Sequence, residues 1–323
     1  MKKFIINLTL CGIGLLVFVI TFDQMIYAGI KKSKYGEFAK FEEVMQGEID
    51  AEILIVGSSR ALVHFDCEQI EAKLGKSCYN LGFDGVGYEP QSKLLELYQR
   101  KNNPPSEIIW VIDLNSFEVE NELYGFEPLV IFSGEKEIKQ MLNINKAIPS
   151  YLYYIPLIRF KFKETFKFRG ILSFFGREFS QRSIKKGYRE MDKTWDYKLD
   201  ELLKSNTTKY QYILSKDLIS DFEKNVNKLK SNGITVSVVF TPLHVDADLV
   251  IENKVEILSQ IDSIASNLSL PYFNYANDSI NLSREWFYNA NHLNKNGVEF
   301  WMKIFLEDYE KYKNSDFSLY SNE

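Results

Sequence analysis

Histidine is rare in this chain, with three residues, His64, His244 and His292, among 323. A catalytic or metal-binding imidazole must therefore come from one of these positions. No histidine or cysteine spacing is typical of a zinc site. The glycine-rich stretch 82–87 also lacks the Gly-Lys-Ser/Thr ending of a phosphate loop and the glycine spacing of a dinucleotide-binding loop. We therefore expect neither a metal ion nor another cofactor.

Cysteine and positive net charge are scarce as well. Of the three cysteines, Cys67 and Cys78 lie outside the apolar N-terminal segment. One disulfide and two buried free thiols are both compatible with these positions, because a domain of this size does not need a cross-link. The net charge of -5 argues against a general nucleic-acid binder, which would carry a basic domain. We expect no nucleic-acid partner.

The long hydrophobic run of the chain stands at its N-terminus. Residues 4–22 are almost uninterrupted apolar residues that follow two lysines and end at Asp23. At about 1.5 Å per residue, such a helix crosses a hydrocarbon core of roughly 30 Å. A weak cleavage site at 27–29 leaves a removed signal as the alternative, but the run is long for one, and we predict an uncleaved anchor over residues 1–25. The two lysines predict a single-pass protein of the inner or cytoplasmic membrane, with its N-terminus inside and the remaining chain extracytoplasmic, in the periplasm or at the cell surface.

Alternating strands and helices follow a tether over residues 26–50. Short apolar runs typical of buried strands alternate with segments of helical periodicity, which predicts a central parallel sheet of about five strands with helices on both faces. This α/β domain is expected over residues 51–116 and 216–315, with a tail over 316–323. The predicted strands start near Ile53, Cys78, Ile108, Ile234 and Tyr272.

The alternation is lost over residues 117–215, which we expect to form a mainly helical insertion. Aromatic and basic residues are concentrated there, as in 151–154, 159–163 and 174–177. Basic segments with aromatic residues favour membrane surfaces. One interpretation is therefore a cap over the active site that touches the membrane, an anionic polymer or a membrane partner. The other is a helical subdomain with a solvated basic face.

The first candidate for chemistry is Ser59. An apolar run, Ile53–Val56, is cut off there by Gly57-Ser58-Ser59, and a small-residue turn after a buried strand can present a side chain to a cleft. A plain turn between strand and helix is the alternative. Because the carboxyl ends of parallel strands share one crevice, Gly82, Asn115 and His244 are expected along the same edge as Ser59.

A serine nucleophile needs a base within hydrogen-bond distance and donors for the developing oxyanion. His292 stands in the loop before the last helix, from which it can return to the crevice, although a loop-stabilising role is the alternative. His244 is the rival base, and His64 is expected to point away from the nucleophile. Arg60 is a candidate for binding an anionic part of the substrate, or for pairing with a nearby carboxylate, and His244 is the second candidate for substrate binding.

Taken together, these residues resemble the SGNH (GDSL-like) hydrolase superfamily. The first block is 55–59, with Ser58 where Asp is common; 80–82 and 113–115 are similar to the second and third blocks, and His292 to the last. The resemblance covers roughly residues 51–115 and 232–305. It implies a flavodoxin-like three-layer sandwich, Ser59 as the nucleophile, His292 as the base, and an oxyanion hole made by Ser59, Gly82 and Asn115.

One position departs from this family pattern. The family places an acid three residues before the histidine, and Asn289 stands there. An amide can orient the imidazole, but it does not stabilise the imidazolium as a carboxylate does. Three outcomes are open: a slow Ser59–His292 pair, a protein that binds without turnover, or an acid supplied from elsewhere, with Asp246, Asp278 and Glu285 as candidates.

The resemblance implies a membrane-anchored extracytoplasmic serine esterase or O-acyltransferase. Its substrate would be an acylated cell-envelope polysaccharide, a related glycan or a small ester, with an integral membrane acyltransferase as a partner. The alternative is a non-catalytic protein of the same fold that binds or assembles envelope components, because the usual acid is Asn289. A lipid-active esterase is a third interpretation, motivated by the aromatic insertion.

Overall fold

The computed structural model describes residues 1–34, 36–177, 184–205 and 208–320. The chain divides into two compact units, one of Met1–Gln46 with Asn121–Ser183 and the other of Gly47–Glu120 with Ile184–Glu323. Residues 184–215, which were expected within the insertion, therefore belong to the second unit.

The second unit contains a five-stranded sheet with the order β2-β1-β3-β6-β7, in which every neighbouring pair is parallel. This is the strand order of flavodoxin-like folds. The predicted class and the predicted strands are confirmed. The strands are β1 (Ile53–Val56), β2 (Cys78–Asn80), β3 (Glu107–Val111), β6 (Thr235–Phe240) and β7 (Tyr272–Asn274).

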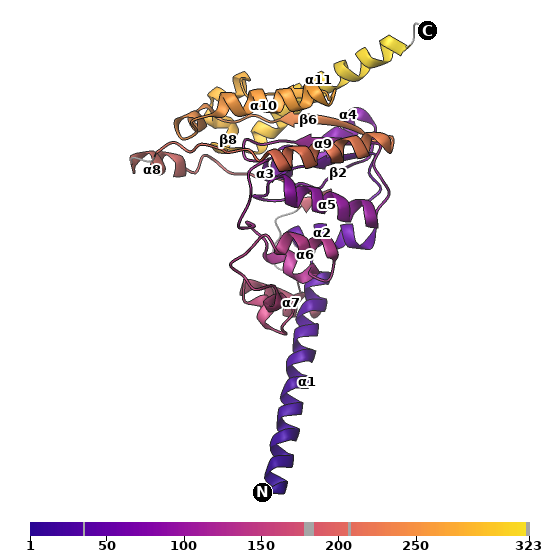
Figure 1. Ribbon diagram of the computed structural model, residues 1–323, viewed down its shortest axis with the longest axis vertical. Coiled ribbons are helices and arrows are strands. Elements are labelled where there is room, and N and C mark those ends of the chain that lie inside the picture. The colour runs from indigo at the N-terminus through magenta and orange to yellow at the C-terminus, as the bar shows by residue number, and fades with distance from the viewer. Residues whose placement is uncertain (35, 178–183, 206–207, 321–323) are drawn as a thin grey trace. The chain divides into compact units, whose positions relative to one another are not determined.

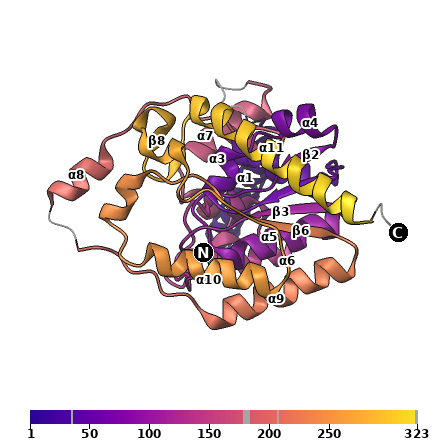
Figure 2. The same cartoon turned by 90° about the horizontal axis from the view of Figure 1, so that it is seen from above.

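Helices cover both faces of this sheet, which is why the strands read as continuous apolar runs. Figure 2 shows α4 and α11 on one side of the sheet and α9 on the other. Phe65 packs edge-on against Trp301 with ring centroids 5.1 Å apart, and Trp110 packs against Phe222 at the same distance. The helices are α3 (Ser59–His64), α4 (Cys67–Leu74), α5 (Tyr88–Lys101), α8 (Lys198–Lys204), α9 (Lys216–Ser231), α10 (Lys254–Asn267) and α11 (Lys295–Tyr320).

Shorter elements complete the second unit. A disulfide between Cys67 and Cys78 joins the start of α4 to β2 and answers the question that the sequence leaves open. Two small antiparallel hairpins flank the sheet, and the second carries His292. The hairpins are β4 (Ile184–Lys185) with β5 (Tyr188–Arg189) and β8 (Phe287–Asn289) with β9 (His292–Leu293), and the 3-10 turns are η4 (Val245–Leu249), η5 (Ser279–Leu282) and η6 (Arg284–Trp286).

The first unit is built around one long helix. Helix α1 (Lys2–Lys32) is long and apolar enough to cross a membrane, and it is the one such helix in the described ranges. In Figure 1, α7 lies beside the C-terminal part of α1. The other elements are α2 (Gly36–Gln46), η1 (Glu127–Phe132), α6 (Lys136–Leu142), η2 (Ser150–Tyr153), η3 (Ile158–Phe160) and α7 (Thr165–Phe174).

Candidate active site

A cavity of about 220 Å³ lies at the carboxyl edge of the parallel sheet. Its walls come from the segments that follow β1, β2, β3 and β6, from the β8–β9 hairpin, and from Tyr212 in the segment before α9. This is the edge at which ligands bind in open α/β sheets. Ser59, Asn115 and His292 line the cavity.

The turn that presents Ser59 depends on a glycine. Gly57 has a φ of 155°, and a Cβ atom there would lie 2.8 Å from the Cβ atoms of Ala61 and Val111. The chain can therefore pass directly from β1 into α3 because residue 57 has no side chain. Ser58 is the N-cap of α3, where its hydroxyl accepts the Arg60 N–H at 3.3 Å. Ser59 is thus fixed in the first turn of α3, beside the cavity.

Ser59, His292 and Asn289 form a hydrogen-bonded series. Ser59 Oγ lies 2.8 Å from His292 Nε2, and His292 Nδ1 lies 2.9 Å from Asn289 Oδ1. Asn289 Oδ1 also accepts the Asn291 N–H at 3.0 Å, which identifies it as the amide oxygen. An amide oxygen can only accept, so Nδ1 carries the proton and Nε2 is left to accept from the Ser59 hydroxyl. This tautomer is the one that a general base for Ser59 requires.

The β8–β9 hairpin explains why a spacing of three residues brings Asn289 to His292. The two residues pair directly across the hairpin, on either side of a two-residue turn. The ring of Tyr288 stacks on the imidazole, with centroids 5.3 Å apart and planes within 8° of parallel. Orientation of His292 is therefore built into the hairpin itself.

The electrostatic surroundings keep His292 neutral. Burial, followed by the positive charges of Arg60 and Arg189, lowers the pKa of His292 from 6.5 to about 3. Asn289 places no negative charge behind the ring to oppose this effect. The imidazole is therefore available as a proton acceptor at neutral pH, but its protonated form is disfavoured.

His64 supports the segment that carries His292. Its ring is buried; Nδ1 lies 2.8 Å from Thr241 Oγ1, and Nε2 accepts the Leu293 N–H at 2.9 Å. Burial and the nearby charge of Arg60 hold the pKa of His64 well below its usual value. The His64 ring also packs edge-on against the His292 ring, with centroids 6.2 Å apart, and its hydrogen bond to Leu293 holds the next residue of the chain. Nothing in the sequence pattern indicates this contact, because it joins residues 229 positions apart.

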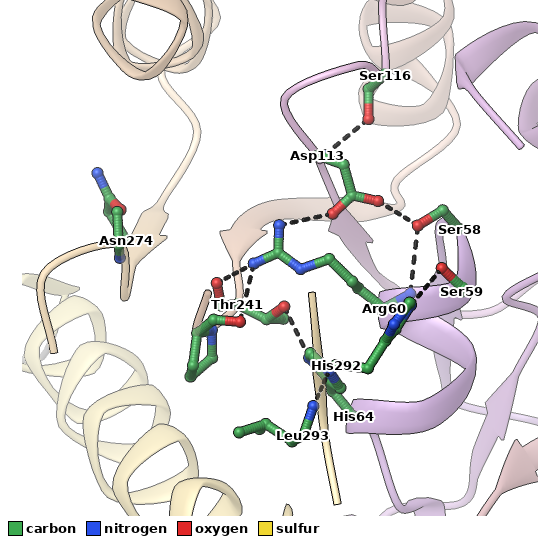
Figure 3. A network of polar contacts seen from close by, with 12 residues as sticks. Ser58, Ser59, Arg60, His64, Asp113, Ser116, Thr241, Asn274, His292 and Leu293 are labelled. Atoms are coloured by element: carbon green, nitrogen blue, oxygen red, sulfur yellow. Dashed lines mark hydrogen bonds and ion pairs between the residues drawn. The ribbon is translucent and has the colours of Figure 1, made fainter. Parts of the chain in front are cut away.

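A buried charged network lies under the serine, as Figure 3 shows. The Arg60 guanidinium pairs with Asp113 Oδ1 at 2.9 Å and donates to the carbonyl oxygens of Thr241 and Pro242. Ser58 donates its hydroxyl proton to the other oxygen of Asp113. Arg60 lines the cavity, and its Nε is buried with no partner among the described residues. Its remaining donors bind protein groups, so Arg60 holds together the ends of β1, β3 and β6.

The structure places Gly82 differently from the expected oxyanion role. The Gly82 N–H donates to Asn80 Oδ1 at 2.9 Å, and the Asn80 amide donates to the Ala61 carbonyl at 2.7 Å. Gly82 is packed against α3 and does not line the cavity. Gly85 and Val86 from the same loop line it instead. The sequence predicts that this glycine-rich loop reaches the edge of the sheet, but it does not tell which of its glycines faces the cavity.

His244 does not reach Ser59. It is buried against Trp195, with ring centroids 4.9 Å apart, and its Nδ1 accepts the Asp246 N–H at 3.1 Å. His244 does not line the cavity, so it fits neither of its two expected roles, as the rival base or as a substrate-binding residue.

The three alternative acids have other partners or positions. Asp246 accepts from Arg284 Nε at 2.8 Å, and Asp278 caps η5 by accepting the Ile280 N–H at 3.0 Å. Glu285 lines a different cavity. The Nδ1 atom of His292 is bound by Asn289, so Asn289 takes the position of the orienting group. No group of three His, Cys, Asp or Glu suited to a metal ion occurs in the ranges that the structure covers.

No protein-family model and no curated protein matches the chain. Among solved structures, it is similar to a protein from Streptococcus pneumoniae that is provisionally described as a platelet activating factor. The TM-score is 0.41 and the sequence identity 10%, over 92% of this chain and 99% of that chain. The proposals below therefore follow from the site geometry.

Proposed function

We propose that the protein is a serine esterase or O-acyltransferase of SGNH type. The observation that carries this proposal is the series Ser59–His292–Asn289, with donor–acceptor distances of 2.8 and 2.9 Å, at the carboxyl edge of the parallel sheet. A nucleophile, a base in the correct tautomer and an orienting group are the parts that acyl transfer through a serine requires.

In the proposed reaction, Ser59 Oγ attacks the carbonyl carbon of an ester while its proton passes to His292 Nε2. The tetrahedral intermediate collapses, the bond to the leaving oxygen breaks, and His292 returns the proton to that oxygen. Water or an acceptor hydroxyl then gives its proton to His292 and attacks the acyl carbon on Ser59. The second tetrahedral intermediate collapses, the bond between the acyl carbon and Ser59 Oγ breaks, and His292 returns the proton to Ser59 Oγ, which completes hydrolysis or transfer. Asn289 Oδ1 accepts the hydrogen bond from His292 Nδ1–H throughout and holds the ring in place.

The developing oxyanion needs donors in the same cavity. The exposed Asn115 side chain and the backbone amide of Ser59 remain the proposed donors. Gly85 replaces Gly82 in this proposal, because the Gly82 amide is directed at Asn80 and Gly85 lines the cavity.

The size of the cavity favours a short acyl group. Its volume of about 220 Å³ lies below the roughly 300–1,000 Å³ of sites that enclose drug-sized ligands. A short acyl group such as acetyl fits this space better than a lipid chain. An esterase for soluble or glycan-bound esters is therefore favoured over a lipid-active one.

The N-terminal helix and the disulfide support an extracytoplasmic site of action. Helix α1 is long and apolar enough for a membrane anchor, and disulfides are typical of oxidising compartments. We propose acylated envelope glycans as substrates and an integral membrane acyltransferase as the partner that delivers or receives the acyl group.

The direct test is labelling of the full chain with a fluorophosphonate, together with hydrolysis of p-nitrophenyl acetate. We expect labelling that mass spectrometry assigns to Ser59 and not to the neighbouring Ser58. Ser59→Ala should abolish labelling and lower hydrolysis at least about 10³-fold, because it removes the nucleophile. Equal signals from the native chain and Ser59→Ala would rule out the esterase.

The second candidate function is a non-catalytic envelope protein that binds glycans in the same cavity. It is favoured by the amide at position 289 and by the low pKa of His292, because both weaken the base. Folded protein that takes no label but binds acylated glycan would support this candidate.

A further inference from the structure

The segment 159–177 of the first unit has an unusual composition. It contains six Lys or Arg residues and six phenylalanines, with Glu164 as its single acid. Helix α7, Thr165–Phe174, lies within this segment. The proposed chemistry at Ser59 uses none of these residues.

Helix α7 has a buried face and an exposed apolar face. Phe166, Gly170 and Ser173 are buried, whereas Phe168 is 58% and Phe175 67% exposed. Phe168, the half-buried Leu172 and the C-cap residue Phe175 follow each other at intervals of four and three residues, so they share one side of α7. Exposed aromatic side chains next to cations form a surface that matches lipid headgroups in both charge and polarity.

The buried face of α7 crosses α1 at close range. A Cβ atom on Gly170 would lie 2.5 Å from the Ile26 carbonyl oxygen, and one on Gly29 would lie 1.8 Å from the Gly170 carbonyl oxygen. The preceding turn is tied to α1 as well. Asp23 accepts the Leu157 N–H at 2.8 Å and Arg159 Nε at 3.0 Å. The position of α7 along α1 is therefore fixed.

This crossing point lies just beyond the apolar span of α1. The span ends at Phe22, and the close approach to Gly170 of α7 is made by Ile26 and Gly29. At about 1.5 Å per residue, the contact lies roughly 6–10 Å past the end of the hydrocarbon core. The headgroup layer of each leaflet is about 5–8 Å thick. If α1 spans the bilayer, α7 is held at the level of the headgroups.

We propose that α7 is an interfacial helix that binds the surface of an anionic phospholipid bilayer. The face with Phe168, Leu172 and Phe175 enters the boundary between headgroups and acyl chains. The cations of segment 159–177 bind the phosphate groups of anionic lipids. Each cation near the surface raises the affinity for the bilayer about fivefold. The proposal rests on α1 as a membrane span and is independent of any catalysis at Ser59.

The test uses the full chain in lipid nanodiscs, with an environment-sensitive NBD fluorophore on Phe175→Cys in a Cys11→Ser background. The other two cysteines are joined in the disulfide and do not react. The discs contain phosphatidylcholine alone, or with about a third phosphatidylglycerol. Val255→Cys provides a matched control, because Val255 is also an exposed apolar residue of a helix, at 81% exposure, in the other unit.

We expect the probe at 175 to shift its emission to the blue and to be quenched by a lipid that carries a nitroxide near the headgroup. Both effects should grow with phosphatidylglycerol, and Lys161→Gln/Lys163→Gln/Lys167→Gln should lower this lipid dependence at least fivefold. If the emission is equally blue-shifted with and without phosphatidylglycerol, and is unchanged by the three substitutions, the anionic-lipid site is overturned. A probe that stays in water in both discs would overturn the interfacial helix, and would leave this face for a protein partner.

Discussion

The two sides of the candidate site are held by different kinds of interaction. On the serine side, residues 58–60, the buried ion pair of Arg60 with Asp113 joins the ends of three strands. On the histidine side, residues 289–293, the acceptors Asn289 and His64 hold the imidazole and the next residue by neutral hydrogen bonds. In a Ser-His-Asp triad the carboxylate stands behind the imidazole. Here the nearby carboxylate lies under the serine and is neutralised by an arginine.

This difference separates orientation from charge. The histidine side provides the geometry of a triad without its negative charge. On the serine side, the positive charge of Arg60 disfavours the protonated imidazole. Burial is the largest cause of the low pKa of His292, and the positive charges of Arg60 and Arg189 lower this pKa further. Four experiments test this difference between the two sides.

The largest effect is expected from Arg60→Met, which breaks the serine side. The substitution leaves the Asp113 carboxylate buried without its partner, and such a loss costs about 3–5 kcal/mol. Urea unfolding followed by circular dichroism measures the change. The double variant Arg60→Met/Asp113→Asn should recover part of the loss, because no unpaired charge remains. A cost below about 1 kcal/mol for the single variant would show that the pair is not structural.

His64→Phe tests the histidine side. It removes the acceptor for the Leu293 N–H and the donor to Thr241, at a cost of about 2 kcal/mol for the buried groups left unpaired. Any esterase activity should also fall, because the hairpin that carries His292 loosens. His64→Gln should lose less, since its amide offers an acceptor to Leu293. Unchanged unfolding free energy in His64→Phe would contradict the support that we assign to this residue.

Asn289→Asp places a carboxylate behind the His292 imidazole, where the native chain has an amide. A carboxylate behind the ring stabilises the imidazolium, so we expect kcat/KM for p-nitrophenyl acetate at pH 7 to rise about tenfold or more. Asn291→Asp is the matched control, because it adds the same charge in the same turn without a contact to the imidazole. Equal rates for the native chain and both variants would show that another group already supplies the charge.

The smallest effect is expected in the pH profile of the native chain. A base with the usual pKa of 6.5 loses activity about tenfold per pH unit below that value, whereas His292, with a pKa of about 3, stays neutral. We therefore expect kcat/KM to be flat from pH 8 to about 5, and Asn289→Asp to shift the acid limb upward.

Stability sets the lower limit of that pH range. The folded-state pKa values of His64 and His292 lie below the unfolded value, so the unfolded state takes up protons first and stability falls as the pH drops below about 6.5. Circular dichroism at each pH identifies the folded range. A steep loss of activity near pH 6.5 in folded protein would contradict the low pKa of His292.

Much of the fold could be predicted because the strands are short apolar runs buried on both faces, as in Ile53–Val56. Their parallel order then brings Ser59 and the last loop to one edge, and the hairpin spacing puts Asn289 beside His292. These two contacts follow from chain topology and local geometry. Their catalytic roles stay predictions.

Pairing of Arg60 with a carboxylate was one of its two expected roles, but the identity of that carboxylate and the contact of His64 with the Leu293 backbone could not be predicted. The Arg60–Asp113 pair and the His64–Leu293 hydrogen bond depend on rotamers and on segments 53 and 229 residues apart. The choice between Gly82 and Gly85 depends on the path of one loop, which composition leaves open. Sequence patterns therefore predict which groups reach the edge, but not which of them are already bound there.

The glycine contact between Gly29 and Gly170 makes α1 a helix whose rotation matters as much as its length. One residue inserted between Phe22 and Ile26 would turn the following residues by about 100° about the helix axis and carry Gly29 away from α7. A change in the apolar span before Phe22 would leave this phase untouched. The register between α1 and α7 is therefore counted in residues along α1, and it is independent of the length of the apolar span before Phe22.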